Sequence, residues 1–229
     1  MTPAEEVAQG CRVLAANGNS DMIWGHLSLR DPNGSGIWLK EAGYGLNEIT
    51  PDRVVHIDET GTPLTKPGKV HLEYPIHTEI MAARPDVNAV VHSHAESAVV
   101  FASTGLPLLP IGHEGTLFWP PDIPRFTRTG DLIHTPALGA EVAQTLSTRN
   151  ALLLINHGLI TVGPDIPTAV LTAIFLEKAC RMQLQATSIT PTPTHSPHPE
   201  SLTKRTRCYP PTQLTPAYHH LTRTLPPPP

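Results

Sequence analysis

The chain has 229 residues and a formal net charge of −4 at pH 7, with 16 Lys and Arg against 20 Asp and Glu. This balance gives no electrostatic reason to expect nucleic acid or an anionic membrane as a partner, so we predict neither. The length suits one domain with a substantial core and a tail, and no apolar run approaches the roughly 20 residues that a membrane span needs.

Hydrophobic periodicity and turn residues divide the first half of the chain into helices and strands. The predicted elements, in chain order, are a helix over 3–18, strands over 25–30, 36–40 and 54–58, a helix over 73–84, a strand over 87–92, a helix over 96–103 and a strand over 106–111. Turn residues at 31–34 predict that the first two strands form a hairpin. Pro85 ends the second helix, because the residue before a proline disfavours helical backbone.

The second half of the chain predicts a loop, two strands, a long helix and a tail. In chain order these are a loop over 117–131, strands over 152–155 and 159–162, a helix from a cap at Asp165 to about residue 186, and a tail over 188–229. Strands near both ends with helices between them predict an α/β fold with a central mixed sheet.

The composition changes sharply at Thr187, after which Pro, Thr, Ser and His dominate. Such a segment cannot bury enough apolar surface to offset the entropy of ordering it. We therefore predict a folded domain over 1–187 and a mostly disordered tail over 188–229, with one short helix near 213–223.

The three cysteines, Cys11, Cys180 and Cys208, are odd in number and widely spaced. They predict a reducing compartment without a disulfide framework. The acidic N-terminus lacks the basic and apolar stretches of a signal peptide. We therefore expect a soluble, cytoplasmic protein.

Three histidines stand at the ends of two apolar runs. His92 and His94 end the run that begins at Val87, and His157 follows the run 151–156. Residues i and i+2 of a strand point to the same face, so both imidazoles of the first pair can face one point, which His157 could reach from a neighbouring strand. Three imidazoles with an open position are typical ligands of a catalytic divalent metal. The spacing therefore predicts a metal site with room for substrate.

Four phrases of the sequence resemble the class II aldolase/adducin family over about residues 5–186. They are Gly25-His-Leu-Ser-Leu-Arg30, the helix start from Glu73 to His77, Ala83-Arg-Pro-Asp-Val-Asn-Ala-Val-Val-His-Ser-His94, and Asn156-His-Gly158. The resemblance implies a three-layer α/β fold with a mixed, mainly antiparallel sheet between helices. It also implies a homotetramer with active sites at subunit contacts.

The same resemblance assigns roles to residues. His92, His94 and His157 would bind one divalent metal ion, which in the family is often zinc and sometimes manganese, cobalt or iron. Glu73 would be the acid/base residue, and His71 would assist it.

The chain departs from the sugar-phosphate aldolases of the family at the residues that hold a phosphate. Their hydroxyl-bearing residues are replaced here by His26, Lys40 and His71, which suit a carboxylate or a phenolic oxygen better. The Gly-His-Leu-Ser variant resembles a branch that includes metal-dependent decarboxylases of hydroxylated aromatic acids. We predict His26, Lys40 and His113 as substrate-binding residues.

These features favour a metal-dependent carbon–carbon lyase that acts on a small molecule. Decarboxylation of a small hydroxylated carboxylic acid, through an enolate that the metal stabilises, is favoured over aldol cleavage of a phosphorylated sugar or hydroxy-keto acid. A non-catalytic adducin-like binding module and a metal-dependent oxygenase remain alternatives. The sequence does not identify the metal, because imidazole ligands accept several.

Overall fold

The computed structural model describes residues 1–34 and 36–227, and these residues form a seven-stranded sheet with the order β3-β2-β1-β4-β7-β6-β5. The strands are β1 (His26–Arg30), β2 (Ile37–Lys40), β3 (Val54–Ile57), β4 (Ala89–Ser93), β5 (Arg125–Phe126), β6 (Ala151–Leu154) and β7 (Gly158–Gly163). Every neighbouring pair is antiparallel except β5 with β6. The predicted mixed, mainly antiparallel sheet is confirmed.

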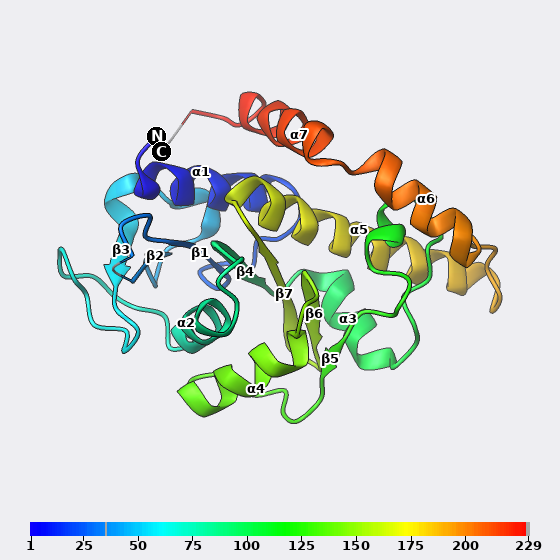
Figure 1. Ribbon diagram of the computed structural model, residues 1–229, viewed down its shortest axis with the longest axis horizontal. Helices are drawn as coiled ribbons and strands as arrows, with labels where there is room; N and C mark the ends of the chain where they lie inside the picture. The colour runs from blue at the N-terminus through cyan, green and yellow to red at the C-terminus, as the bar shows by residue number, and fades with distance from the viewer. Residues whose placement is uncertain (35, 228–229) are drawn as a thin grey trace.

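Helices cover both faces of the sheet (Figure 1). One face packs against α1 (Pro3–Ala16), α3 (Glu96–Thr104) and α5 (Ile166–Ile189), and the other against α2 (Tyr74–Ala83) and α4 (Pro136–Leu146). Alternation along β4 serves both cores, since Val91 lies in the first and Val90 in the second. The three-layer α/β fold is therefore confirmed.

Local signals fix the ends of the main helices. Thr2 and Glu5 form a capping box at the start of α1, and the Asp165 side chain accepts a hydrogen bond from the N–H of Thr168 at the start of α5. These carboxylate and hydroxyl groups satisfy N–H groups that a helix start leaves without partners. The predicted helices over 3–18 and from Asp165 are thus present, the second extending to Ile189.

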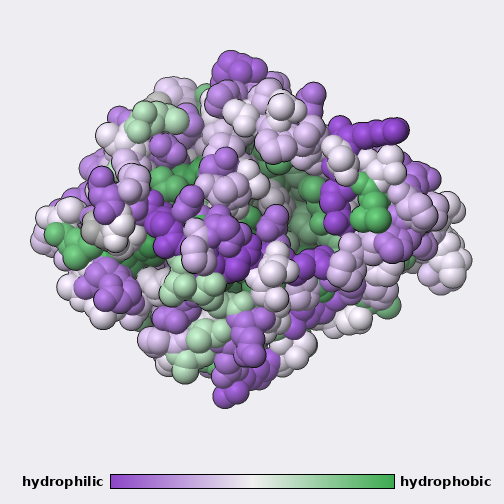
Figure 2. All heavy atoms as spheres, viewed as in Figure 1, coloured by the Kyte–Doolittle hydropathy of each residue, from purple (hydrophilic) through white to green (hydrophobic). Residues whose placement is uncertain are grey.

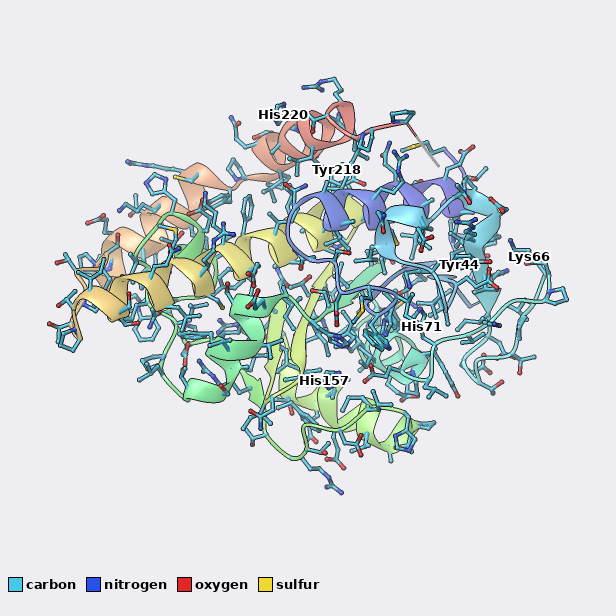
Figure 3. All side chains as sticks on the ribbon, turned by 180° about the vertical axis from the view of Figure 1, so that it is seen from behind. Tyr44, Lys66, His71, His157, Tyr218 and His220 are labelled. Atoms are coloured by element: carbon cyan, nitrogen blue, oxygen red, sulfur yellow. The ribbon has the colours of Figure 1, made fainter. Side chains whose placement is uncertain are left out.

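Residues 188–227, the described part of the predicted tail 188–229, differ from the prediction of a mostly disordered segment. They carry α6 (His198–Cys208) and α7 (Pro211–Arg223), the second of which covers the short helix expected near 213–223. Tyr218 is 3% exposed between α7 and the helices beneath it (Figure 3). Leu214, Tyr218 and Leu221 thus pack against the first core from one face of α7, a pattern that composition averaged over the segment conceals.

Two further elements differ from the prediction between residues 106 and 146. The expected strand over 106–111 is a loop, because Pro107 and Pro110 lack the N–H groups that a ladder needs. The helix α4 was not predicted, and β5 lies inside the expected loop over 117–131. Gly139 lies inside α4 although glycine favours helices poorly. The position requires glycine because an added Cβ would lie 2.6 Å from the carbonyl oxygen of Pro75 on α2.

None of the helices within residues 1–34 and 36–227 combines the length and the apolarity that crossing a membrane requires. On the face in Figure 2, hydrophobic residues lie as small separate patches among hydrophilic ones.

Candidate metal centre

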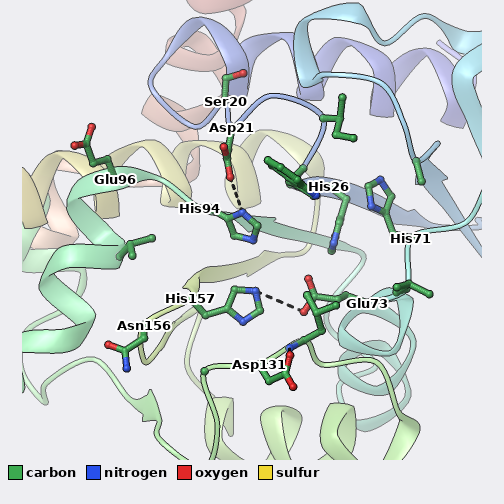
Figure 4. A pocket seen from close by; sticks show the side chains of 18 of the residues that line it. Ser20, Asp21, His26, His71, Glu73, His94, Glu96, Asp131, Asn156 and His157 are labelled. Atoms are coloured by element: carbon green, nitrogen blue, oxygen red, sulfur yellow. Dashed lines mark hydrogen bonds and ion pairs between the residues drawn. The ribbon is translucent and has the colours of Figure 1, made fainter.

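Four side chains from separate elements meet at the edge of the sheet where β4 ends and β7 begins. They are Glu73, which precedes α2, His92 on β4, His94 just after it, and His157 in the turn between β6 and β7. One ligand atom from each lies within 4.8 Å of the others. Figure 4 shows His94, His157 and Glu73 around one point, with Asp21 behind His94.

The turn between β6 and β7 depends on two unusual residues. Asn156 has φ +53°, in the left-handed region that Asn tolerates better than most residues. At Gly158 an added Cβ would clash with the carbonyl oxygen of Ser93. These two residues let β7 approach the end of β4 closely, which places His157 opposite His92 and His94.

The imidazole rings of His92 and His94 point their Nε2 atoms toward each other. His92 Nδ1 lies 3.0 Å from the carbonyl oxygen of Leu159, and His94 Nδ1 lies 2.8 Å from a carboxylate oxygen of Asp21. Both partners only accept, so each Nδ1 carries a hydrogen, and in the metal-binding form of each ring Nε2 presents its lone pair. These two Nε2 atoms are 3.2 Å apart. Two ring nitrogens that converge in this way suit a cation between them, and held Nδ1 hydrogens are usual behind metal-binding histidines. The residues therefore fit a divalent metal ion.

Glu73 completes the cluster as a buried carboxylate, 6% exposed. Oε2 lies 3.5 Å from His92 Nε2, Oε1 lies 3.6 Å from His157 Nε2, and Oε1 also accepts the N–H of Ile133 at 2.8 Å. Burial alone would raise the pKa of Glu73, but its contacts with the His157 and His92 rings hold the pKa below its usual value. The carboxylate is therefore ionised and fixed in direction.

A cavity of about 1000 Å³ opens beside this cluster. Its lining includes the polar side chains of His26, His71, Glu73, His94 and His157. It also includes the apolar side chains of Ile23, Trp24, Val99, Val100 and Leu132. A cavity that combines apolar surface with converging polar groups is typical of a small-molecule site.

Behind the wall, His26 belongs to a chain of buried hydrogen bonds. His26 Nδ1 lies 2.6 Å from His77 Nε2, and His77 Nδ1 lies 2.6 Å from Ser28 Oγ. Burial lowers the pKa of His26 and of His77 well below the usual histidine value, and crowding by neighbouring imidazoles disfavours a positive charge on either ring further. Both rings are therefore neutral.

Lys40 differs from the prediction of a direct substrate contact. It is fully buried on β2 and is not among the residues that line the cavity. Its ammonium donates to the carbonyl oxygen of Ile23 at 3.0 Å and lies 3.2 Å from His71 Nε2. Burial lowers the pKa of Lys40 to about 8, and burial beside Lys40 lowers the pKa of His71 to about 3. Lys40 therefore supports His71 from behind.

His113 also differs from its predicted place. It is exposed just before the short helix Glu114–Leu117, its Nδ1 lies 3.7 Å from Cys208 Sγ, and it does not line the cavity. The loop that carries it packs against α5 and α6 instead of the end of β4. Within the described chain, His113 does not join the other predicted site residues.

Sequence reasoning missed three residues that hold the site. Asp21 lies 73 positions from the His94 that it orients, in a segment with no periodic pattern, so the sequence carried no signal for it. Ser28 could have been found, because residues i and i+2 of β1 place it on the same face as His26. His77 lies 51 positions from the His26 that it contacts, and its place in the helix start gave no signal for this contact.

Comparisons with known proteins agree with this geometry. Residues 5–184 match the family model described as the Class II Aldolase and Adducin N-terminal domain. The 3,4-dihydroxyphthalate decarboxylase of Arthrobacter keyseri is 34% identical over 80% of this chain and 78% of its own. The 4-hydroxy-3-prenylphenylpyruvate oxygenase/4-hydroxy-3-prenylbenzoate synthase of Streptomyces roseochromogenus subsp. oscitans is 30% identical over 73% of this chain and 61% of its own. Among solved structures, L-fuculose 1-phosphate aldolase from Glaciozyma antarctica PI12 matches with a TM-score of 0.83 and 26% identity, over 96% of this chain and 88% of that one.

Proposed function

Because the chain belongs to the class II aldolase and adducin family, we propose that it is a divalent-metal-dependent lyase that removes CO₂ from a small hydroxylated aromatic carboxylic acid. The observation that carries this proposal is the convergence of three imidazoles and the Glu73 carboxylate within 4.8 Å at the wall of a cavity. The 34% identity to a 3,4-dihydroxyphthalate decarboxylase supports the choice of reaction.

The Nε2 atoms of His92, His94 and His157 would hold the ion, which we propose to be zinc, or else manganese, cobalt or iron. When bound, the ion would act as a Lewis acid toward the substrate oxygen beside the breaking bond. Leu159 and Asp21 fix the directions of two of these rings by accepting their Nδ1 hydrogens.

Glu73 would move the proton that the reaction needs. As an ionised carboxylate it can accept the proton of the substrate hydroxyl and pass it to the ring carbon from which CO₂ leaves. The bond to the carboxylate breaks, its electron pair stays with the ring, and the same carbon gains the proton. The N–H of Ile133 holds Oε1, so Oε2 is the oxygen free to carry the proton. His71 stays a proposed assistant in this step.

The apolar part of the cavity lining suits an aromatic substrate. Trp24, Val99 and Leu132 belong to that lining, and apolar side chains would exclude water from the reacting carbon. This arrangement would limit the loss of the proton to solvent.

The decisive experiment measures CO₂ release from 3,4-dihydroxyphthalate and related hydroxybenzoates by purified protein loaded with each candidate metal. Glu73→Gln keeps the size of the side chain and should lower kcat by about a hundredfold or more, the usual range for a general acid–base residue. Bound metal measured by elemental analysis should stay above half of the wild-type content, because three imidazoles remain. Absence of CO₂ from every acid would contradict the proposal.

Aldol cleavage is a second candidate, favoured by the structural match to L-fuculose 1-phosphate aldolase at 26% identity. Release of an aldehyde from a phosphorylated ketose, without CO₂ from any aromatic acid, would establish it. The relative from Streptomyces supports an oxygenase in the same way, and oxygen consumption with iron but not with zinc would favour that activity. Protein that stays free of metal after metal-replete growth would favour a binding module.

We also propose the homotetramer with sites at subunit contacts. Large apolar side chains at the cavity, among them Ile23, Trp24, Leu72, Val100 and Leu132, are 41–69% exposed in the single chain. Exposed apolar groups around a cavity are typical of a surface that another chain covers. Light scattering on the purified protein would test the mass.

A further inference from the structure

Lys40 is a buried cation without an anionic partner. Its side chain is fully buried, and no carboxylate within the described residues lies at ion-pair distance from its Nζ. Lysine is almost never fully buried unless it is paired with an opposite charge. Nζ donates instead to the carbonyl oxygens of Ile23 and Glu41 and to the cavity-lining ring of His71. The positive charge therefore lies one imidazole away from the cavity.

The Lys40 contact fixes the tautomer of His71. An ammonium group only donates, so Nε2 of His71 accepts and the ring hydrogen resides on Nδ1. His71 is therefore a neutral ring with an N–H group, polarised from behind by a cation.

The chain Ser28–His77–His26 fixes the second ring in the same sense. Ser28 Oγ is buried and contacts only His77 Nδ1 among the side-chain hydrogen bonds of the described residues. If His77 donated to Ser28, the hydroxyl hydrogen would be left without an acceptor in the core, which native proteins avoid. The hydroxyl therefore donates to Nδ1, His77 Nε2 donates to His26 Nδ1, and His26 carries its hydrogen on Nε2.

Both rings line the cavity, and their centroids lie 4.5 Å apart. We propose that His26 and His71 form a subsite for a carboxylate group of the substrate, with Ser28, His77 and Lys40 as positioning residues that keep each ring a donor. The subsite rests on the proposed function only for the identity of the reaction.

The carboxylate held in this subsite is the one that stays on the product. Two N–H groups and a nearby cation stabilise a carboxylate as an anion, and a leaving carboxylate gives up that charge as CO₂ forms. Binding that favours the starting state over the transition state slows a reaction. The leaving carboxylate therefore lies toward Glu73, and the substrate class is a hydroxylated aromatic dicarboxylate.

The matched substrates for the test are 3,4-dihydroxyphthalate and 2,3-dihydroxybenzoate, which is the same molecule without the second carboxylate. The wild-type protein should have a KM about tenfold or more lower for the dicarboxylate, the usual value of one hydrogen bond to a charged group. Ser28→Ala and Lys40→Met should each reduce this KM preference about threefold to tenfold. Ser28→Thr, which keeps a hydroxyl, should restore it.

Thr161→Val is the control variant, because Thr161 is another fully buried hydroxyl of the sheet, whose hydrogen goes to the carbonyl oxygen of Ala169. It should leave the ratio of the two KM values unchanged. Equal loss of preference in Thr161→Val and Ser28→Ala would mean that general packing sets the ratio, and would overturn the subsite.

A measurement without turnover separates this inference from the proposed reaction. In a spectrum of ¹⁵N-histidine-labelled protein, the His26 signals, identified by their loss in His26→Gln, should show a hydrogen on Nε2. Phthalate should shift that signal, whereas benzoate at the same concentration and inorganic phosphate should shift it less. This pattern supports the subsite even if no acid releases CO₂. A hydrogen on His26 Nδ1, or CO₂ release with no preference for the dicarboxylate, would overturn it.

Discussion

The two neighbouring groups of histidines at the cavity, His92, His94 and His157 on one hand and His26 and His71 on the other, use the same ring with opposite polarity. In the metal cluster, the carbonyl of Leu159 and the carboxylate of Asp21 accept the Nδ1 hydrogens, so lone pairs face inward. In the other group, the donors stand behind the rings: the Lys40 ammonium behind His71, and the Ser28 hydroxyl behind His77 and His26. The partner behind a ring thus decides whether the ring suits a cation or an anion.

The difference also separates the two groups energetically. The metal cluster has an ionised Glu73 beside its imidazoles, whereas Lys40 has no opposite charge within the described part of the chain. The metal cluster therefore favours a cation, whereas the rings of His26 and His71, with Lys40 behind them, favour an anion. The following predictions test this contrast, beginning with the largest effect.

Removing one of the three imidazoles of the metal cluster should abolish metal binding. His92→Ala should lose most of the bound metal and lower kcat/KM by about a thousandfold or more, since the remaining ligands no longer form a three-imidazole set. Metal content by elemental analysis, together with CO₂ release, checks this. Full metal content in the variant would show that His92 is not a ligand.

Removing the Lys40 charge behind His71 should stabilise the protein in the absence of substrate. Burial lowers the pKa of Lys40 from 10.5 to about 8, and at about 1.4 kcal/mol per pKa unit the buried charge costs up to about 3 kcal/mol. Lys40→Met should raise the free energy of unfolding by up to that amount, while it weakens preference for the dicarboxylate.

The pH dependence of this gain has a definite sign. Below pH 8 the lysine is charged in both states, and the full cost is present. From pH 8 toward 10.5 only the unfolded state holds the proton, so the native wild type becomes more stable relative to its unfolded state. The advantage of Lys40→Met should therefore shrink from pH 7 to pH 10 in denaturant titrations. A constant advantage would mean that Lys40 is not a buried cation.

Changing Asp21, the hydrogen-bond partner of His94, should lower metal affinity without removing a metal ligand. Asp21→Asn should lower metal affinity about tenfold to a hundredfold, because an amide can offer its N–H₂ or its oxygen and no longer holds one His94 tautomer. Competition with a fluorescent chelator measures the affinity. Asn19→Asp changes a neighbouring buried residue that bonds Ser93 and should alter metal affinity less.

Spacing along strands predicted the parts of the site that depend on short-range geometry. His92 and His94 share a face because they are two apart, and His157 lies in the turn that leads into β7, the strand that pairs with β4. The sheet and the long helix α5 follow from the same periodicity. These features need only local backbone regularity and the rule that strands pair with neighbours.

The rest depends on packing between distant segments, which one sequence does not encode in a readable pattern. His77 on α2 meets His26 and Ser28 on β1, and Lys40 at the end of β2 meets His71 from the segment before α2. The docking of α7 through Tyr218 depends in the same way on surface offered by α1 and α5.

The turn that carries His157 has a consequence for how this sequence can vary. Because any Cβ at position 158 would meet the Ser93 carbonyl, the neighbour of a metal-facing ring is closed to all substitution, even by alanine. Saturation mutagenesis followed by growth or activity selection should return glycine alone there, whereas the exposed Asn156 beside it should accept aspartate. Substitutions that change the chemistry of this site are therefore expected among the residues that line the cavity and not at the glycine of the turn between β6 and β7.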